Sequence, residues 1–357
     1  MTISDQELDR IYNKAVDLLS ELIRIPSLSK EENQRADFLF DYLVHEKLKP
    51  KRIGNNIILS NDVDRPKKRI LLNSHIDTVK ASPSWTHNPF DPIQVNGKLY
   101  GLGSNDAGAS VVSLLMTYIH MSHWDNAFDL IFAASAEEEI SGQNGIIKVI
   151  EEIGEVDLAI VGEPTGMQMA TAEKGLMVID GLATGVSGHA AREEGQNAIY
   201  IALQDIQSIK EFDFDKVSDL LGKTKATVTI INAGTQHNVI PDQCKFVIDI
   251  RANELYTLHE IYSLLQSTVK STLTPRSFRL KPSYIDHRHP IVIKGKSMGI
   301  SCYGSPTLSD QALMPYRSVK IGPGQSSRSH TADEYIELNE IKLGIKTYIE
   351  LLKGLEL

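Results

Sequence analysis

The order of apolar and polar residues along this chain predicts an alternation of amphipathic helices and short buried strands. Apolar residues recur on one helical face at residues 4–24 and again at residues 31–46. Continuous apolar runs at residues 70–72, 128–136 and 156–161 are typical of buried strands. Helices placed between such strands indicate an α/β fold with a largely parallel central sheet.

The pattern changes in the middle of the chain and later returns to its first form. Three strands with alternating polarity and two helices are predicted in the middle part, at residues 176–183, 225–231, 244–251, 197–212 and 254–271. We therefore expect one domain formed by residues 1–175 and 285–357, interrupted by a smaller α+β domain at residues 176–284. The second part of the first domain is predicted to contain helices at residues 307–314 and 338–355.

Two residues that can bind a metal follow the first of these buried strands. His75 and Asp77 are two positions apart, so their side chains point to the same side of an extended backbone. A carboxylate in this position can accept a hydrogen bond from the imidazole and fix its tautomer while the imidazole binds a metal. A stabilising contact at a strand end has the same pattern, so the pair by itself leaves both interpretations open.

Acidic residues follow the other buried strands. The run at 128–136 leads into Glu137, Glu138 and Glu139, and the next strand is followed by Glu163. Adjacent carboxylates at the end of a buried strand are costly unless a cation neutralises them, although a solvated loop would also accommodate them. Asp106 lies on a glycine-containing loop before a predicted helix, where it could instead be an N-cap. Because ligands bind beyond the carboxyl ends of parallel strands, these acids are expected at one edge of the sheet.

Composition narrows the possible partners. The chain has 357 residues, enough for two domains, and a formal net charge of −9, which argues against nucleic acid or an acidic membrane as partner. Cys244 and Cys302 are the only cysteines, so the ligands of a metal would have to be histidines and carboxylates. The first residues lack the features of a signal peptide, and no apolar run reaches membrane-spanning length, so we expect a cytoplasmic protein.

The candidate residues together suit two zinc-like ions that share one bridging carboxylate. Each ion would take one histidine, one further carboxylate and the shared aspartate. Two such ions can activate a water molecule and polarise a carbonyl group, and one glutamate would remain as general base. This chemistry is typical of amide hydrolysis. The candidates are His75, Asp106, Glu138 or Glu139, Glu163 and His330.

Seven short motifs occur along nearly the whole chain. They lie at residues 74–79, 101–108, 136–145, 162–165, 185–190 and 238–241, and at Gly322-Pro323-Gly324 followed by His330. In this order and spacing they resemble the family of acetylornithine deacetylase, succinyl-diaminopimelate desuccinylase, carboxypeptidase G and the aminoacylases. The resemblance implies a zinc-exopeptidase-like catalytic domain that is interrupted by a ferredoxin-like dimerisation domain.

The resemblance also implies roles for individual residues. Two divalent metal ions, zinc with cobalt or manganese as alternatives, would be held by His75, Asp106 and Glu163 and by Asp106, Glu139 and His330. Asp77 would orient the histidine, and Glu138 would be the general base. The three consecutive glutamates leave open whether Glu137 and Glu138 are instead the base and the ligand. The peptide bond between Asp106 and Ala107 is expected to be cis.

In the inserted domain, the resemblance implies that His189 stabilises the oxyanion in the other subunit of a homodimer. Asn238, Arg251 and Gly324 would contact the substrate, and the guanidinium group suits a substrate carboxylate. An ion pair at a strand end is the alternative interpretation of Arg251.

The expected substrate is a small N-acyl amino acid, with N-acetylornithine in arginine biosynthesis as the leading hypothesis. Removal of a succinyl group from diaminopimelate or ornithine, cleavage of dipeptides or tripeptides, and a non-catalytic relative are the alternatives.

Overall fold

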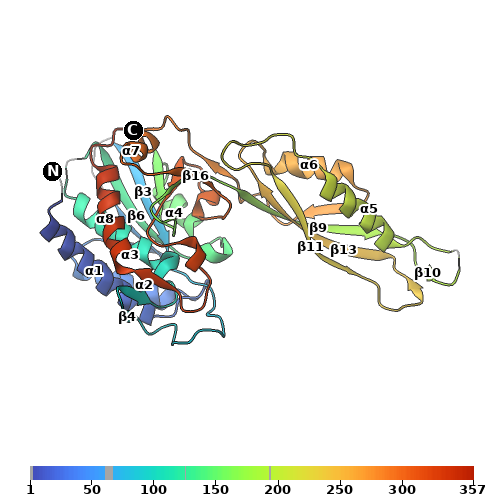
Figure 1. The fold of residues 1–357 in the computed structure, drawn as a ribbon, viewed down its shortest axis with the longest axis horizontal. Coiled ribbons are helices and arrows are strands. Elements are labelled where there is room, and N and C mark those ends of the chain that lie inside the picture. Colours follow the sequence, from blue (N-terminus) through green and yellow to red (C-terminus); the bar gives the residue numbers. More distant parts are fainter. Residues whose placement is uncertain (1–2, 61–66, 125, 193) are drawn as a thin grey trace. The chain divides into compact units, whose positions relative to one another are not determined.

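The computed structural model describes residues 3–60, 67–124, 126–192 and 194–357, and the chain divides into two compact units (Figure 1). The first unit comprises Met1–Thr171, Tyr284–Tyr303 and Ser309–Leu357. The second unit comprises Ala172–Ser283 and the short return segment Gly304–Leu308. The sequence pattern did not suggest this return segment.

A mixed sheet forms the centre of the first unit. Among the described residues it has nine strands in the order β1-β2-β6-β3-β7-β17-β8-β15, with β16 paired to β8. The central strands β6, β3, β7 and β17 are parallel, and β1, β2 and β8 pair antiparallel, which confirms the predicted α/β fold with a largely parallel sheet. The strands are β1 (Lys51–Ile53), β2 (Asn56–Ser60), β3 (Lys68–His75), β6 (Phe128–Ser135), β7 (Leu158–Val161), β8 (Met169–Glu173), β15 (Ser283–Tyr284), β16 (Cys302–Ser305) and β17 (Ser318–Lys320).

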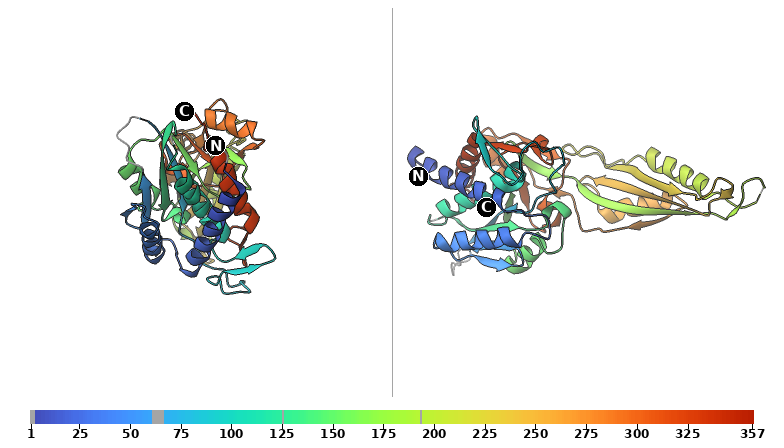
Figure 2. Two further views of the ribbon diagram at one scale, coloured as in Figure 1. Left: turned by 90° about the vertical axis from the view of Figure 1, so that its left-hand side faces the viewer. Right: turned by 90° about the horizontal axis from the view of Figure 1, so that it is seen from below.

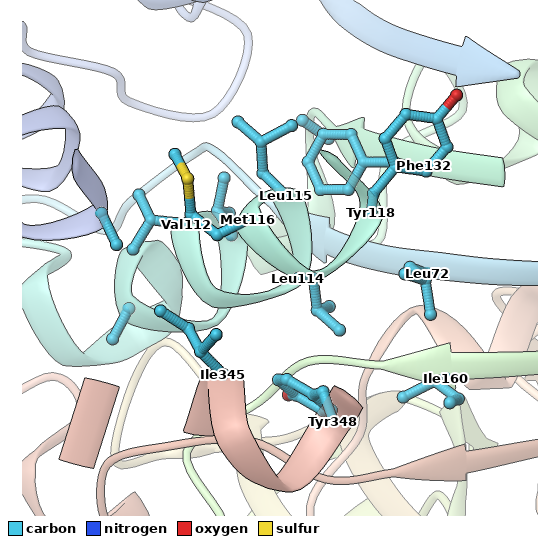
Figure 3. Close-up of a cluster of buried hydrophobic side chains, with 14 of the residues drawn as sticks. Leu72, Val112, Leu114, Leu115, Met116, Tyr118, Phe132, Ile160, Ile345 and Tyr348 are labelled. Carbon is cyan, nitrogen blue, oxygen red and sulfur yellow. The ribbon is translucent and has the colours of Figure 1, made fainter. Parts of the chain in front are cut away.

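Alternate residues of the central strands pack into two different cores. Ile70 and Leu72 of β3 belong to the larger core, whereas Leu71 between them belongs to the smaller core on the other face. This alternation follows from the two-residue period of a strand. In the larger core the rings of Tyr118 and Phe132 lie 6.4 Å apart between a helix and the sheet (Figure 3). The continuous apolar runs in the sequence therefore reflect strands that are covered on both faces.

Helices cover both faces of this sheet. α1, α3 and α8 pack against one another on the face of the larger core, and α4 packs on the opposite face (Figure 2). The helices are α1 (Asp5–Arg24), α2 (Asn33–His45), α3 (Ala109–Met121), α4 (Ile146–Ile153), α7 (Pro290–Ser297) and α8 (Leu338–Leu352). A separate small sheet consists of β4 (Ile93–Val95), β5 (Lys98–Tyr100) and β18 (Tyr335–Glu337). Within the described residues, no helix combines the length and the apolar character that crossing a bilayer requires.

The second unit contains an antiparallel sheet in the order β11-β13-β9-β14. Its elements are β9 (Gly175–Thr184), β10 (Gly188–His189), α5 (Ala198–Glu211), β11 (Lys225–Ala233), β12 (Val239–Ile240), β13 (Gln243–Ala252), α6 (Leu258–Thr268) and β14 (Thr272–Pro275). The two helices cover one face of the sheet (Figure 1), and β10 pairs with β12 outside it. This separate antiparallel sheet agrees with the predicted α+β character of the middle segment.

Two predicted helices were too long. The helix predicted at 307–314 is wrong except for a single 3₁₀ turn at Asp310–Leu313, because Ser309 caps that turn and Pro315 stops its continuation. The helix predicted at 254–271 begins only at Leu258. Thr257 and Glu260 form a reciprocal capping box there, a signal that the sequence carries.

Candidate metal centre

The predicted metal ligands of the first unit meet at one edge of the central sheet. His75 is the last residue of β3, Glu138 and Glu139 follow β6, and Glu163 follows β7. Asp106 lies in the turn before α3 and makes no capping hydrogen bond to that helix. These strand ends place the acids where the α/β fold predicts a ligand site.

The carboxylate of Asp106 lies between two histidines. Its Oδ1 is 3.4 Å from Nε2 of His75, and its Oδ2 is 3.6 Å from Nε2 of His330. On the first side, Oε1 of Glu163 is 3.8 Å from His75 Nε2, and on the second side Oε2 of Glu139 is 3.0 Å from His330 Nε2. The two predicted ligand sets are therefore brought together around opposite oxygens of one carboxylate, as a bridging role requires.

Two buried polar atoms in this cluster fit a bound metal ion. Nε2 of His75 and Oε1 of Glu163 have no hydrogen-bond partner among the described residues, although both are enclosed. Nδ1 of His75 lies 3.0 Å from the backbone carbonyl oxygen of Asp77. The carbonyl oxygen can only accept, so Nδ1 carries the proton and Nε2 presents a lone pair. Unpaired buried polar atoms are rare, and a divalent cation would satisfy both.

The charges in the cluster also favour a cation. Burial, together with the charge of Glu163 and other acids, raises the pKa of Glu138 well above its usual range despite the opposing effect of His75. Burial likewise raises the pKa of Glu163. The hydrogen bond to Glu139 raises the pKa of His330 to about 9. Asp106, Glu138, Glu139 and Glu163 lie close to His75, and His330 lies close to Asp106 and Glu139, so divalent ions would supply the missing positive charge.

The three consecutive glutamates point in different directions. The carboxylate of Glu137 accepts hydrogen bonds from the backbone N–H (3.2 Å) and the side-chain amide (2.9 Å) of Asn144. Oε2 of Glu138 lies 3.8 Å from His75 Nε2, and Glu139 faces His330. This arrangement favours Glu138 and Glu139 as base and ligand over Glu137 and Glu138.

Asp77 contacts more than the imidazole. Its carboxylate lies 3.4 Å from Nδ1 of His75. The backbone carbonyl oxygen of Asp77 lies closer to this nitrogen, at 3.0 Å. The carboxylate accepts hydrogen bonds from the backbone N–H groups of Glu138 (3.0 Å) and Glu139 (3.1 Å) and from Oγ of Ser29 (2.7 Å). Asp77 therefore joins the histidine strand to the loop that carries the two glutamates.

Two further buried carboxylates support the cluster and were missed from the sequence. Glu334 accepts hydrogen bonds from the backbone N–H groups of the loop around Asp106, and burial raises its pKa to about 8. Asp310 accepts hydrogen bonds from Nδ2 of Asn73 (2.8 Å) and Oγ of Ser135 (2.6 Å), and burial raises its pKa to about 6. Asn73 and Ser135 are polar residues inside otherwise apolar strands, and this was the sequence signal from which their contact with Asp310 could have been found.

The turn around Asp106 has two special backbone features. The peptide bond between Asp106 and Ala107 is cis, as expected. Gly324 has φ +91°, and a Cβ atom there would lie 2.4 Å from Oδ1 of Asn105. Glycine is therefore required at this position by its backbone conformation and by its close approach to the turn. Its predicted contact with substrate stays a prediction.

The second unit holds the other predicted site residues. His189 is exposed, and its Nδ1 accepts a hydrogen bond from the backbone N–H of Ala191 (3.1 Å), so its proton is on Nε2. The pairing of β10 with β12 places it beside Asn238, whose carbonyl oxygen accepts from the N–H of Ala190. Arg251 forms a two-pronged ion pair with Asp249 (2.9 and 3.2 Å), which is the alternative interpretation given above. The roles of these residues stay predictions.

The fold and the acidic cluster with its two histidines are those expected of a metal-dependent hydrolase. The sequence of residues 71–354 matches Peptidase family M20/M25/M40, and the chain belongs to this family of metallohydrolases. It is 28% identical to the LysW-lysine/LysW-ornithine hydrolase of Sulfurisphaera tokodaii over 98% of both chains. It is 26% identical to acetylornithine deacetylase of Buchnera aphidicola over 95% of this chain and 97% of the relative. These findings confirm the family resemblance.

A solved structure shows the same fold. The YXEP protein of Bacillus subtilis, described as a dinuclear metal-binding peptidase of the M20 family, superposes with a TM-score of 0.74. The match covers 96% of this chain and 98% of that chain at 15% sequence identity. At this sequence identity the match shows a shared fold and nothing more specific.

Proposed function

We propose that this chain is a dimetal amidohydrolase that cleaves the amide bond of an N-acyl amino acid, with N-acetylornithine as the leading substrate. The observation that carries the proposal is the position of Asp106, whose two oxygens face His75 and His330. Glu163 and Glu139 complete the two ligand sets. Zinc is the expected metal, and cobalt or manganese are alternatives, because imidazole and carboxylate ligands accept all three.

In this proposal Glu138 moves the proton. Two divalent ions held here would polarise the scissile carbonyl group and activate water. The carboxylate of Glu138 would take a proton from the attacking water and deliver it to the leaving amine. The backbone carbonyl oxygen of Asp77 accepts from Nδ1 of His75 and so fixes the tautomer in which Nε2 can bind a metal.

A panel of acylated substrates tests the reaction class. We expect zinc-loaded protein to hydrolyse N-acetylornithine faster than N-acetylcitrulline, N-succinylornithine, N-succinyl-diaminopimelate and a set of dipeptides. Release of the free amine is measured, and Glu138→Ala protein prepared in parallel controls for contaminating hydrolases. A preference for a succinyl substrate or a peptide would name one of the alternatives. No turnover of any substrate by protein that holds two metals would contradict the proposal.

A second candidate is hydrolysis of LysW-linked lysine or LysW-linked ornithine. It is favoured by the 28% identity with the S. tokodaii hydrolase over 98% of both chains. The acetylornithine deacetylase relative likewise has ornithine in its name, so both comparisons favour a basic amino acid as product. Hydrolysis of LysW-linked ornithine, with N-acetylornithine left intact, would favour this second candidate.

A homodimer is part of the proposal. β11 is an edge strand of the sheet in the second unit, and its Ile230 and Ile231 are 51% and 48% exposed. An apolar edge strand with free backbone groups readily pairs with a second copy of itself. Tyr200 and Leu203 of the adjacent helix α5 are also exposed, at 67% and 50%. A second copy of the chain would cover these residues.

The shared site gives a prediction for His189. Its Nε2–H has no hydrogen-bond partner among the described residues and can donate to an oxyanion, and loss of one such donor lowers kcat by about 10²–10³-fold. We expect His189→Ala to show this decrease without loss of thermal stability. Mixing His189→Ala with Glu138→Ala protein should restore part of the activity, because mixed dimers contain one complete site.

The control is His287→Ala, since this histidine is exposed and lies outside the proposed machinery. An unchanged rate for His189→Ala would remove the proposed role. Activity that returns when the His189→Ala and Glu138→Ala proteins are mixed would support an active site shared between subunits. If His189→Ala is slow and mixing does not restore activity, His189 would belong to the active site of its own subunit.

A further inference from the structure

The loop that carries the two proposed active-site glutamates is held by side chains from elsewhere in the chain. We call residues 136–139 the acidic loop. Each of its four consecutive backbone N–H groups donates to a side-chain oxygen rather than to a backbone carbonyl oxygen. The acceptors are Oδ1 of Asn56 for Ala136 (2.9 Å), Oε1 of Glu32 for Glu137 (3.1 Å), Oδ1 of Asp77 for Glu138 (3.0 Å) and Oδ2 of Asp77 for Glu139 (3.1 Å).

A short segment before α2 supplies two of the side chains that hold this loop. Glu32 is fully buried, and its Oε1 also accepts from the N–H of Lys30 (2.7 Å) while Oε2 accepts from Nδ2 of Asn55 (2.8 Å). Ser29 donates its hydroxyl hydrogen to Oδ2 of Asp77 (2.7 Å). The segment thus contacts the loop directly through Glu32 and indirectly through Ser29 and Asp77.

Capping of the following helix does not account for Glu32. It occupies the N-cap position of α2, but its side chain makes no capping hydrogen bond to that helix. The side chain instead points to the acidic loop. Glu32 is buried and has no ion pair among the described residues, so its carboxylate needs several donors, which come from the loop, from its own turn and from Asn55.

The conformation of the acidic loop explains why it needs this support. Glu137 has φ +55°, a left-handed conformation that residues other than glycine adopt rarely. The reversal at Glu137 lets the next two side chains diverge, so that Glu138 approaches His75 and Glu139 approaches His330. A shift of this backbone would displace the proposed base and the proposed ligand together.

We propose that Glu32 and Ser29 are positioning residues that set the backbone of the acidic loop, and through it the metal ligand Glu139 and the base Glu138. This inference rests on the proposed function. Residues behind the direct ligands of a metal commonly change metal affinity or activity by about 10–100-fold. Neither residue touches the metal or the substrate in this scheme.

Adjacent glutamates provide a matched test. Glu31 is exposed and Glu32 is buried, so Glu31→Ala and Glu32→Ala remove the same group from neighbouring positions. We expect Glu32→Ala to weaken one of the two zinc equivalents by about 10–100-fold, as measured by competition with a chromophoric chelator, and to lower kcat by a similar factor. Glu31→Ala should match the wild type in both measurements. Glu32→Gln, which keeps an acceptor oxygen for the loop, should retain most of the affinity.

Ser29 provides a test that does not depend on a buried charge. Ser29→Ala should lower kcat and the affinity for the same zinc equivalent. Ser29→Thr should retain wild-type values of both, because it keeps the hydroxyl group. These two variants decide the question if Glu32→Ala fails to fold. Folded Glu32 and Ser29 variants that bind two zinc ions with wild-type affinity would overturn this inference and leave the proposed function standing. A wild-type protein that binds no metal would overturn the proposed function and this inference with it.

Discussion

Replacement of Glu138 by alanine is expected to lower turnover by about 10²–10⁴-fold while both metal equivalents stay bound. The carboxylate lies 3.8 Å from His75 Nε2, and its side chain is 13% exposed, so a water molecule can reach it. Burial and the charge of Glu163 raise its pKa, a property of general bases that work near neutral pH, although bound metal ions would lower it again. Loss of a general base costs about 10²–10⁴-fold in rate.

The experiment separates a base from a ligand. Turnover of the best substrate and zinc content per chain are measured on the same preparations of wild-type and Glu138→Ala protein. Glu137→Gln is the comparison variant. The carboxylate of Glu137 accepts hydrogen bonds from Asn144, so this substitution is expected to lower turnover less. Retained zinc with lost turnover would assign Glu138 as the base. Loss of one zinc equivalent from Glu138→Ala would make it a ligand, and a larger decrease in Glu137→Gln would transfer the role of base to Glu137.

Four of the predicted metal-site residues share one property. His75, Glu138, Glu139 and Glu163 all stand at the ends of apolar runs, and a parallel sheet gathers such ends at one edge. The strands themselves were predictable because they are buried on both faces and therefore continuously apolar. Both signals are local in the sequence, so no long-range contact had to be known.

The supporting residues could not be found in this way. Glu32, Glu334 and Ser29 lie in polar segments, and most of their partners are backbone N–H groups or groups distant in sequence. A backbone N–H group is present at almost every residue, so such a contact leaves no pattern of residue types. Glu334 contacts a loop 228 residues away. Only the folded chain shows that these side chains fix the backbone of the turn around Asp106 and of the acidic loop.

Replacement of Asp106 by alanine is expected to remove both metals, in contrast to the loss of one metal from Glu163→Ala. Its Oδ1 and Oδ2 face different histidines, at 3.4 and 3.6 Å, so one side chain belongs to both ligand sets. The loss of a shared ligand leaves His75 with Glu163 and His330 with Glu139, two ligands for each ion. Zinc sites in enzymes ordinarily keep three protein ligands, so neither remaining pair is expected to hold its ion tightly.

Zinc content and thermal stability together measure this effect. A ligand that binds only the folded state raises Tm, so saturating zinc should raise the Tm of the wild type and of the exposed-site control Asp91→Ala. For Asp106→Ala we expect little zinc after gel filtration, no rise in Tm on adding zinc, and no turnover. Glu163→Ala should keep part of the rise, since the ligand set of Asp106, Glu139 and His330 remains complete. One tightly bound zinc in Asp106→Ala, with a normal rise in Tm, would show that the two sites do not share this carboxylate, and the dinuclear assignment would fall because its central ligand would serve a single ion.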